Sequence, residues 1–336
     1  NSFFPFSVCS FISNCAFFTL GQVASNKKAV VHDLRIEDCT IRDVWGVGCH
    51  ISAGADKPVI YNPVFSHNLI RRTGCDGLII TRAVSPVVEY NRCYGAGALG
   101  VKKTAYIAGI WVGWYTRNSL FQYNEVARTQ TFKGDGNAFD VDNQCTGTHV
   151  FQYNYLHGNE GGPLMVMPTA NAEIHFRYNV SVNSYKTPHP QGHEAFWVPA
   201  NGKSRVQIYN NTFYKDTGSP ISITNNPRVE VRNNIFSIKG SDYTFPEKPT
   251  FSHNCFHGTA NRPGSGNVVA QPLFRRPGAS RDGWFGATDY RLKPDSPCLN
   301  AGTTVKGHGG RDLWGHPLYN GKPDIGAHEF VGPADK

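Results

Sequence analysis

The chain has 336 residues and a formal net charge of +8, with 33 basic and 25 acidic residues. The basic residues form no run and match no nucleic-acid-binding motif, which argues against a nucleic acid as partner. The apolar opening from Phe3 to Phe18 is broken by Pro5 and polar residues and has no basic start, so we expect neither a signal peptide nor a membrane span there. Because the chain also lacks an initiator Met, we expect a domain of a longer protein whose N-terminal part is missing.

Glycine, proline and aromatic residues are abundant, with 35 Gly, 21 Pro, 15 Tyr and 21 Phe. No long stretch has the 3.6-residue period of an amphipathic helix, which favours a single all-β unit built from many short strands. The nine cysteines show neither a CxxC pair nor a paired metal-ligand spacing. We therefore expect buried thiols rather than a zinc site.

A short phrase recurs along the chain, as in Phe121-Gln-Tyr-Asn124 and Phe151-Gln-Tyr-Asn154. Its anchors follow one another at intervals of 20 to 33 residues, and a repeat with a fixed anchor and a variable spacing predicts a solenoid with loop insertions. We expect the anchors to stack in a ladder at a bend, where Asn adopts an unusual φ and bonds to neighbouring backbone. The anchors are Cys15, Cys39, Asn68, Asn91, Asn124, Asn154, Asn179, Asn211, Asn234 and Asn254.

A second apolar strand lies between the anchors, as in Gly109-Ile-Trp-Val-Gly113. When these strands are aligned, their apolar residues fall into two columns, which we predict to form the core. One column holds Leu78, Ile110, Phe139, Leu164, Phe196 and Ile221, and the other holds Ile80, Val112, Val141, Val166, Val198 and Ile223.

The stretch from Lys133 to Asn143 places three carboxylates in eleven residues. Its period of two sends Phe139 and Val141 to one face of a strand and Asp140 and Asp142 to the other. Asp135 precedes this strand between two glycines, where a tight turn can present its side chain beside the polar face. We therefore expect these three acids to converge in an active site.

Aromatic and polar residues gather around the three acids in the aligned repeats. Carboxylates flanked by Trp and Tyr are typical of a sugar site, because aromatic faces pack against pyranose C–H groups while acids act on the hydroxyls and the glycosidic oxygen. The candidate substrate-binding residues are Trp111, Trp114, Tyr115, Arg128, Lys133, His157, Glu160, His193, Glu194 and Trp197.

From about Ser241 the chain becomes rich in Pro, Gly and Arg, and Pro323-Asp-Ile-Gly-Ala-His-Glu-Phe330 resembles the closing segment of many bacterial β-helix proteins. Over residues 8–260 the repeat resembles the right-handed parallel β-helix of the pectate-lyase-like superfamily. This resemblance implies an all-β solenoid, with residues 1–240 forming the coils that carry an active-site groove. Residues 241–336 would form the last coil and a C-terminal cap of the same structural domain. It also implies a secreted or cell-surface bacterial protein.

The run Gly-Asp135-Gly-x-x-x-Asp140-x-Asp142 resembles a motif of carbohydrate-active β-helix enzymes. The spacing from Asp135 to Asp142 is similar to that of the catalytic pair in the β-helix lacto-N-biosidases of glycoside hydrolase family 136, which retain configuration. This resemblance implies that Asp135 is the acid/base and Asp142 the nucleophile. The residues themselves also permit Asp140 and Asp142 as the pair, and their spacing on a strand leaves retention and inversion both open.

We expect a glycoside hydrolase that cleaves an oligosaccharide or polysaccharide without a metal or other cofactor. The main alternative is a polysaccharide lyase, in which Lys133 or Arg128 abstracts a proton and the aspartates bind Ca²⁺. A second alternative is a non-catalytic glycan-binding β-helix, which would tolerate replacement of Asp135 and Asp142. The histidines are more simply substrate ligands than metal ligands, because no second ligand stands at a regular spacing.

Overall fold

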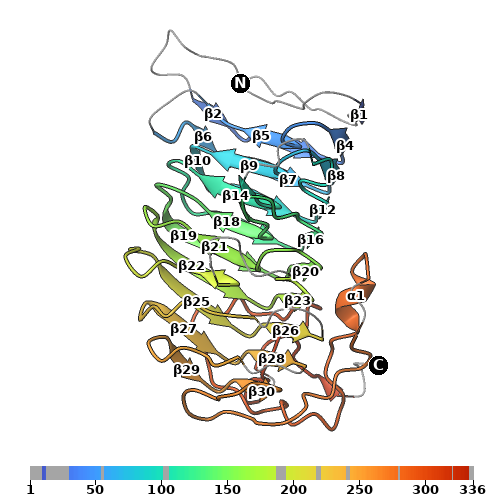
Figure 1. Cartoon of the computed structure of the whole chain (residues 1–336), viewed down its shortest axis with the longest axis vertical. Helices are drawn as coiled ribbons and strands as arrows, with labels where there is room; N and C mark the ends of the chain where they lie inside the picture. Colours follow the sequence, from blue (N-terminus) through green and yellow to red (C-terminus); the bar gives the residue numbers. More distant parts are fainter. Residues whose placement is uncertain are drawn as a thin grey trace.

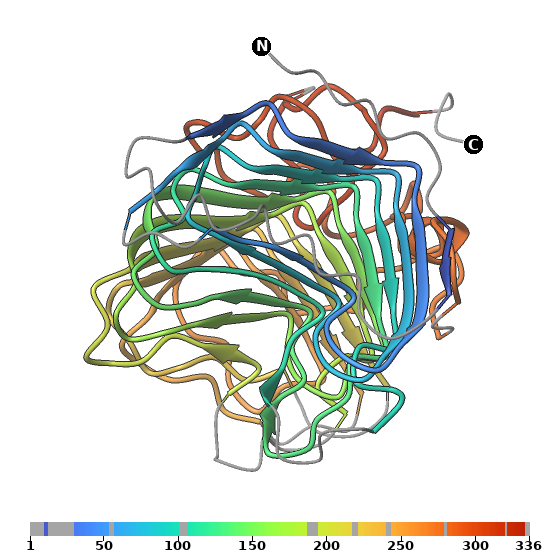
Figure 2. The ribbon, with the colours of Figure 1, turned by 90° about the horizontal axis from the view of Figure 1, so that it is seen from above.

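The computed structural model describes residues 10–12, 30–53, 57–100, 106–186, 194–216, 221–239, 243–278, 281–319 and 321–332. The chain winds into a stack of coils in which each coil pairs in parallel with the next, for example Arg92 with Glu125 and Val87 with Leu120. Figure 1 shows this stack from the side, and Figure 2 shows the coils superimposed along its axis. The predicted all-β parallel solenoid is confirmed.

Three large sheets each take one strand from successive coils. The ten-stranded sheet contains β1 (Ser10–Ile12), β4 (Thr40–Val44), β8 (Leu69–Thr73), β12 (Arg92–Tyr94), β16 (Glu125–Ala127), β20 (Tyr155–His157), β23 (Val180–Val182), β26 (Thr212–Lys215), β28 (Ile235–Ile238) and β30 (Cys255–His257). The nine-stranded sheet contains β3 (Arg35–Glu37), β7 (Val64–Ser66), β11 (Val87–Glu89), β15 (Leu120–Gln122), β19 (Thr146–Gln152), β22 (Asn171–Arg177), β25 (Arg205–Tyr209), β27 (Val229–Arg232) and β29 (Thr250–Ser252).

The third of these sheets has six strands and carries the acid-rich stretch. Its strands are β5 (Cys49–Ile51), β9 (Leu78–Thr81), β14 (Ile110–Gly113), β18 (Phe139–Val141), β21 (Leu164–Val166) and β24 (Phe196–Trp197). Smaller pairings join β2 (Val31–His32), β6 (Ile60–Tyr61) and β10 (Ala83–Val84), and also β13 (Tyr106–Ile107) and β17 (Gly134–Asp135).

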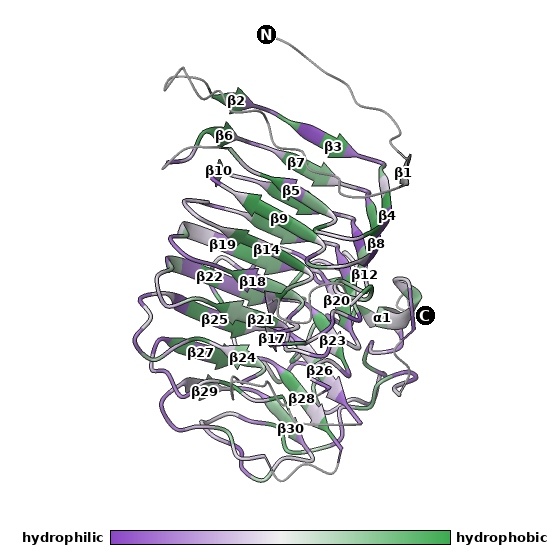
Figure 3. Ribbon diagram, turned by 45° about the horizontal axis from the view of Figure 1, so that its top comes forward, coloured by the Kyte–Doolittle hydropathy of each residue, from purple (hydrophilic) through white to green (hydrophobic). Residues whose placement is uncertain are grey.

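The two predicted core columns are confirmed in the six-stranded sheet. Ile110 pairs with Leu78 on one side and with Phe139 on the other, and all three side chains are buried. Figure 3 shows the apolar character of β9 and β14 within the stack. The alternating sequence buries every second residue between the sheets, and the burial of apolar area is the main favourable term in folding. The seven cysteines among the described residues are buried and form no disulfide, as expected.

A ladder of asparagines fixes the bend between the nine-stranded and ten-stranded sheets. The backbone N–H of Asn124 donates to Oδ1 of Asn154 at 2.9 Å, and its Nδ2 donates to the same oxygen at 3.1 Å and to the Val88 carbonyl at 2.8 Å. The same pattern links Asn68, Asn91, Asn124, Asn154, Asn179, Asn211, Asn234 and Asn254. The predicted ladder is therefore confirmed, and Asn267 extends it by one step.

The unusual φ falls on the residue before each ladder Asn rather than on the Asn itself. His67, Tyr90 and Tyr123 have φ of 54° to 55°, a region that non-glycine residues seldom adopt. Their rings stack face to face, with centroids 4.9 Å apart at each step. These stacked rings contribute favourable contacts at the positions of backbone strain.

The register of the first coil differs from the expectation. Ser10 pairs with Thr40, so the residue that follows Cys9 lies opposite the residue that follows Cys39. The assignment of Cys15 as the first anchor was wrong, and Cys15 itself lies outside the described residues. A short apolar run without a fixed turn allows more than one register, and the stacked neighbour decides between them.

The C-terminal segment covers a face of the solenoid as well as its end. Residues 272–332, here called the strap, run along the outer side of the ten-stranded sheet and carry α1 (Phe285–Thr288), as Figures 1 and 2 show. Tyr290 and Leu292 of the strap are buried in one cluster with Tyr155 and Val180 of the sheet. The outer face of these coils is therefore an interior surface. No helix in the described part of the chain is long and apolar enough to cross a membrane.

We expect Asn154→Ala to destabilise the fold by about 2 kcal/mol or more, because it leaves two buried backbone groups without a side-chain partner at about 1–3 kcal/mol each. These groups are the Asn124 N–H and the Phe121 carbonyl. Chemical denaturation measures the change. Asn225→Ala is the matched control, because Asn225 is exposed and accepts one hydrogen bond, from the Lys248 N–H. Equal losses in the two variants would contradict the role of the ladder.

Candidate functional site

The column that holds Asp140 points away from the main core, as predicted. In the six-stranded sheet Asp140 pairs with Trp111 on one side and with Met165 on the other, and Met165 pairs with Trp197. The column is nevertheless covered, because Trp111 is 9% exposed, Asp140 6% and Met165 1%. Ala108 packs over Trp111. The site therefore lies beneath the residues that join the ten-stranded and six-stranded sheets, rather than on an open surface.

Asp135 lies in the tight turn that its flanking glycines predict. Its φ is +64°, and its carbonyl accepts a hydrogen bond from Thr131 Oγ1 at 3.1 Å. Gly136 has a φ of +79°, and a Cβ there would lie 1.8 Å from Thr131 Oγ1, so only glycine fits. Asp135 is half-buried, and its strand β17 pairs with β13, which leads to the strand of Trp111. The turn thus holds this carboxylate near the covered column.

Asp142 follows β18 and is held by its neighbour. The backbone N–H and the Nδ2 of Asn143 both donate to Oδ1 of Asp142, at 2.6 and 2.7 Å. A Cβ on Gly113 would lie 3.1 Å from Cβ of Asp142 and 2.7 Å from the Trp111 ring. The absence of a side chain at Gly113 therefore lets this carboxyl residue and this indole approach each other.

A fourth carboxyl group, Asp76, joins the cluster and was missed in the sequence. Its Oδ1 accepts a hydrogen bond from the Ala108 N–H at 2.8 Å, and the carboxyl group also accepts one from the Trp111 indole. Asp76 stands two residues before Leu78, as Asn137 stands two residues before Phe139 in the acid-rich coil. An acid at this position in the aligned repeats was the signal that could have identified it.

Burial and neighbouring carboxylates raise the pKa of Asp76, Asp140 and Asp142. Burial raises the pKa of Asp140 well above its usual range, and the charges of Asp142, Asp135 and Asp76 raise it further. Burial also raises the pKa of Asp76 to about 7, against the opposing hydrogen bonds from Ala108 and Trp111. The pKa of Asp142 rises through burial as well, although the Asn143 N–H opposes the rise.

The raised pKa favours the neutral form of Asp140, which lies among other acids. Its Oδ1 is buried and has no hydrogen-bond partner among the described residues. A buried polar atom without a partner is costly, and it is uncommon outside sites that bind a ligand or perform chemistry. Neighbouring acids in different protonation states provide what general acid and nucleophilic catalysis require.

Several predicted aromatic and basic residues lie around this cluster. Trp114 is 38% exposed and packs edge-on against Trp111, with ring centroids 5.6 Å apart. Tyr115 follows it and is half-buried, as is Trp197 at the far end of the column. Lys133 is exposed, and its ammonium lies 5.0 Å from the centre of the Tyr106 ring.

Two other predicted residues belong to a different part of the molecule. His157 is 1% exposed, and its Nε2 hydrogen-bonds to Glu125 at 2.8 Å beneath the strap. Arg128 forms two hydrogen bonds with Asp282 of the strap, at 2.5 and 3.0 Å. Both side chains lie on or next to the ten-stranded sheet and contact the strap, so the structure does not place them with the aspartates.

The two glutamates among the predicted substrate-binding residues accept hydrogen bonds from neighbouring chain segments. Glu160 accepts the Thr131 N–H at 2.6 Å and thereby holds the turn that carries Asp135. Glu194 accepts a hydrogen bond from Thr224 Oγ1 at 3.1 Å. His193 lies outside the described residues.

Two groups of side chains among the described residues bring three metal-ligand atoms within 4.8 Å of one another. They are Asp312 with His316 and His328, and Glu125 with His157 and Asp282. Neither group includes the aspartates of the six-stranded sheet. The Ca²⁺ site expected for the lyase alternative is therefore not preformed at these aspartates.

Comparisons with known proteins agree with the fold. A family model described as a right handed beta helix region matches residues 31–181. A curated relative, lacto-N-biosidase of Bifidobacterium longum subsp. longum, is 29% identical over an alignment that covers 88% of this chain and 22% of the relative. The chain thus spans about a fifth of that relative's length.

The crystal structure of pectate lyase Pel9A superposes with a TM-score of 0.59 at 14% sequence identity. This match covers 96% of this chain and 85% of the lyase chain. At such low identity the likeness concerns the fold alone.

We expect Asp140→Asn to stabilise the protein at pH 7, because the amide carries no charge that burial and the neighbouring carboxylates would oppose. The folded-state pKa of Asp140 lies above its unfolded value, so the wild-type protein loses stability as the pH rises above the unfolded pKa of about 4. The amide does not titrate, and the difference between the two proteins should vanish below that pH. Denaturation at several pH values measures it.

Asp282→Asn is a control of opposite sign, because the hydrogen bonds from Arg128 lower the pKa of Asp282. This variant should be less stable than the wild type at neutral pH, and the difference should shrink in acid. A loss of stability in Asp140→Asn that is the same at every pH would contradict the raised pKa of Asp140.

Proposed function

We propose that the chain is the catalytic β-helix of a glycoside hydrolase that cleaves an oligosaccharide or polysaccharide at the aspartate cluster. The observation that carries this proposal is the gathering of four carboxyl groups around Trp111 in different environments. Asp140 is buried with a raised pKa, two N–H groups of Asn143 donate to Asp142, and Asp135 lies half-buried beside them. Glycoside hydrolysis uses two carboxyl groups in different environments, with an aromatic surface for the sugar ring.

We assign Asp142 as the nucleophile. Both N–H groups of Asn143 point at the same oxygen, Oδ1, and hydrogen bonds to a carboxylate favour its charged form. The raised pKa of Asp140 favours its neutral form, and beside a neutral Asp140 a charged Asp142 meets less repulsion than beside a second carboxylate. In a retaining reaction this group attacks the anomeric carbon and forms a covalent glycosyl intermediate.

We assign Asp135 as the acid/base. It is half-buried at the end of β17, outside the strand β18 that carries Asp140, and water can reach its side chain. It would donate a proton to the leaving oxygen in the first step and take a proton from the attacking water in the second. Thr131 and Glu160 position it, because Thr131 bonds to its carbonyl and Glu160 holds Thr131.

The likeness to a protein named lacto-N-biosidase supports a glycosidase. We take only the reaction type from this name, because the chain spans about a fifth of that relative. The lyase alternative has less support. Arg128 is paired with Asp282 of the strap, and Lys133 is an exposed side chain over the Tyr106 ring.

We expect Asp142→Ala to abolish hydrolysis of all substrates, because it removes the nucleophile that forms the glycosyl intermediate. Asp135→Ala should lose about 10²- to 10⁴-fold on glycosides with poor leaving groups but retain activity on dinitrophenyl glycosides, which need no general acid. Steady-state kinetics on a panel of aryl glycosides and oligosaccharides measures both changes. Asp295→Ala, at an exposed acid of the strap, is the control and should behave as the wild type.

Metal dependence separates the hydrolase from the lyase. On the present proposal activity persists in EDTA, and the products are saturated sugars. Activity that disappears in EDTA, returns with Ca²⁺ and releases unsaturated products absorbing in the ultraviolet would identify a lyase instead. Full activity in Asp142→Ala would overturn the assignment of the nucleophile.

A further inference from the structure

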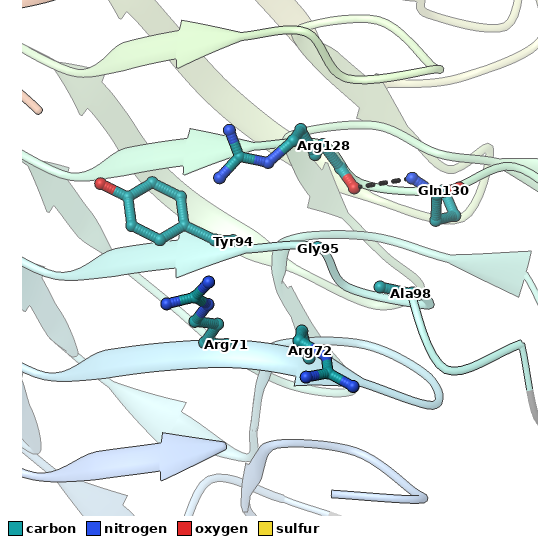
Figure 4. A pocket seen from close by; sticks show the side chains of 7 residues that line it. All are labelled: Arg71, Arg72, Tyr94, Gly95, Ala98, Arg128 and Gln130. Carbon is teal, nitrogen blue, oxygen red and sulfur yellow. Dashed lines mark hydrogen bonds between the residues drawn. The ribbon is translucent and has the colours of Figure 1, made fainter. Parts of the chain in front are cut away.

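A pocket of about 250 Å³ opens on the outer face of the ten-stranded sheet, away from the aspartates. Arg71 of β8 pairs in register with Tyr94 of β12, and Arg128 follows the next strand, β16. Figure 4 shows Arg71 and Arg128 on either side of the Tyr94 ring, with Arg72, Ala98 and Gln130 farther from that ring. The lining residues are Arg71, Arg72, Tyr94, Gly95, Ala98, Arg128 and Gln130.

The charges in this pocket leave one cation uncompensated. Arg128 is neutralised by its two hydrogen bonds to Asp282, and Arg72 lies 3.1 Å from Asp43. Arg71 is exposed, and no carboxylate of the described residues lies within ion-pair distance of it. The pocket therefore presents one free guanidinium, which matches a ligand with a single negative charge.

The walls of the pocket are held in place by contacts beneath it. The Tyr94 hydroxyl donates to the buried Glu125 at 2.7 Å, and the guanidinium of Arg128 lies 5.1 Å from the centre of the Tyr94 ring. Gln130 donates to the Arg128 carbonyl at 3.0 Å. A ligand would thus meet a preformed surface, which lowers the ordering cost of binding.

The size and lining of the pocket indicate what accompanies the charge. Ligand pockets for drug-sized molecules are about 300–1,000 Å³, so this one admits a single small ring. Its lining combines the aromatic face of Tyr94 with Gly95 and, at the edge, Ala98, a surface that suits the C–H groups of a sugar. A carboxylate or sulfate ester on that ring would reach the fork of Arg71.

We propose that this pocket binds one acidic sugar residue, with Arg71 holding its anionic group and Tyr94 packing against its ring. The site is a binding site without catalysis, and it does not depend on the reaction proposed for the aspartates. A glycan with an acidic residue would thereby be held on a second face of the solenoid.

Calorimetry or ligand-observed NMR with two matched probes tests the charge requirement. Methyl β-D-glucuronide should bind at least about tenfold more tightly than methyl β-D-glucoside, because a hydrogen bond between charged groups contributes about 1.5–3 kcal/mol. Arg71→Gln should weaken glucuronide binding by about tenfold or more. Equal binding of the neutral glucoside would overturn the proposal.

Arg42→Gln is the matched control for the loss of one positive charge. Arg42 is exposed, occupies the same column as Arg71 on the adjacent strand, and does not line the pocket. Glucuronide affinity should remain within about twofold of wild type in this variant. Equal losses in Arg42→Gln and Arg71→Gln would show a general charge effect and overturn the site.

A second variant blocks the pocket without changing charge. Ala98 is exposed at its edge, so Ala98→Phe should fill the space, abolish glucuronide binding and leave thermal stability unchanged. Unchanged binding in this variant would overturn the location. A 6-sulfated methyl glucoside that binds more tightly than the glucuronide, and loses affinity in Arg71→Gln, would assign the anion as a sulfate ester. Inorganic sulfate that binds as tightly as either sugar would overturn the role of the ring.

Discussion

The structure depends on keeping parallel coils in one register. Each ladder Asn bonds through its side chain to the next coil and to the backbone of the preceding one. Because side chains alternate from face to face along a strand, a slip of one residue would exchange the core column with the outward column. The ladder prevents such a slip at every coil, and it therefore fixes which residues of the six-stranded sheet face away from the core.

This register places carboxyl groups close together in a covered column, where burial and neighbouring charges disfavour their ionised forms. Asp140 lies in a column between Trp111 and Met165, and the residues leading into β14 and β18 cover it. The scaffold holds the acids by backbone contacts that are independent of their charge, such as the turn at Asp135 and the strand pairing of Asp140. Because these contacts keep the acids from moving apart, burial and the neighbouring charges raise their pKa values instead.

The strap gives the opposite face of the coils a different character. It converts the outer surface of the ten-stranded sheet into an interior, where Glu125 accepts hydrogen bonds from His157, Tyr94 and the Gly283 N–H. Arg128 lies next to this covered surface, where it bonds to Asp282 of the strap and also lines the pocket around Tyr94. Acidic and basic sites thus lie on separate faces of one solenoid, which keeps their charges from neutralising each other.

The sequence by itself determined the repeat, the two core columns and the Asn ladder, because these depend on contacts repeated at every coil and therefore leave a periodic signal. It also identified Asp135, Asp140 and Asp142 as neighbours, because a strand and a turn fix their relation locally. Only the tertiary structure showed that Asp76, which lies 59 residues before Asp135 in the chain, belongs to the cluster. It also showed that His157 and Arg128 lie away from the cluster, in contact with the strap. It alone also showed that Trp111 and Asp140 are covered. These outcomes depend on how loops and the strap fold back across the coils, and such non-periodic contacts between distant segments leave no pattern in the sequence.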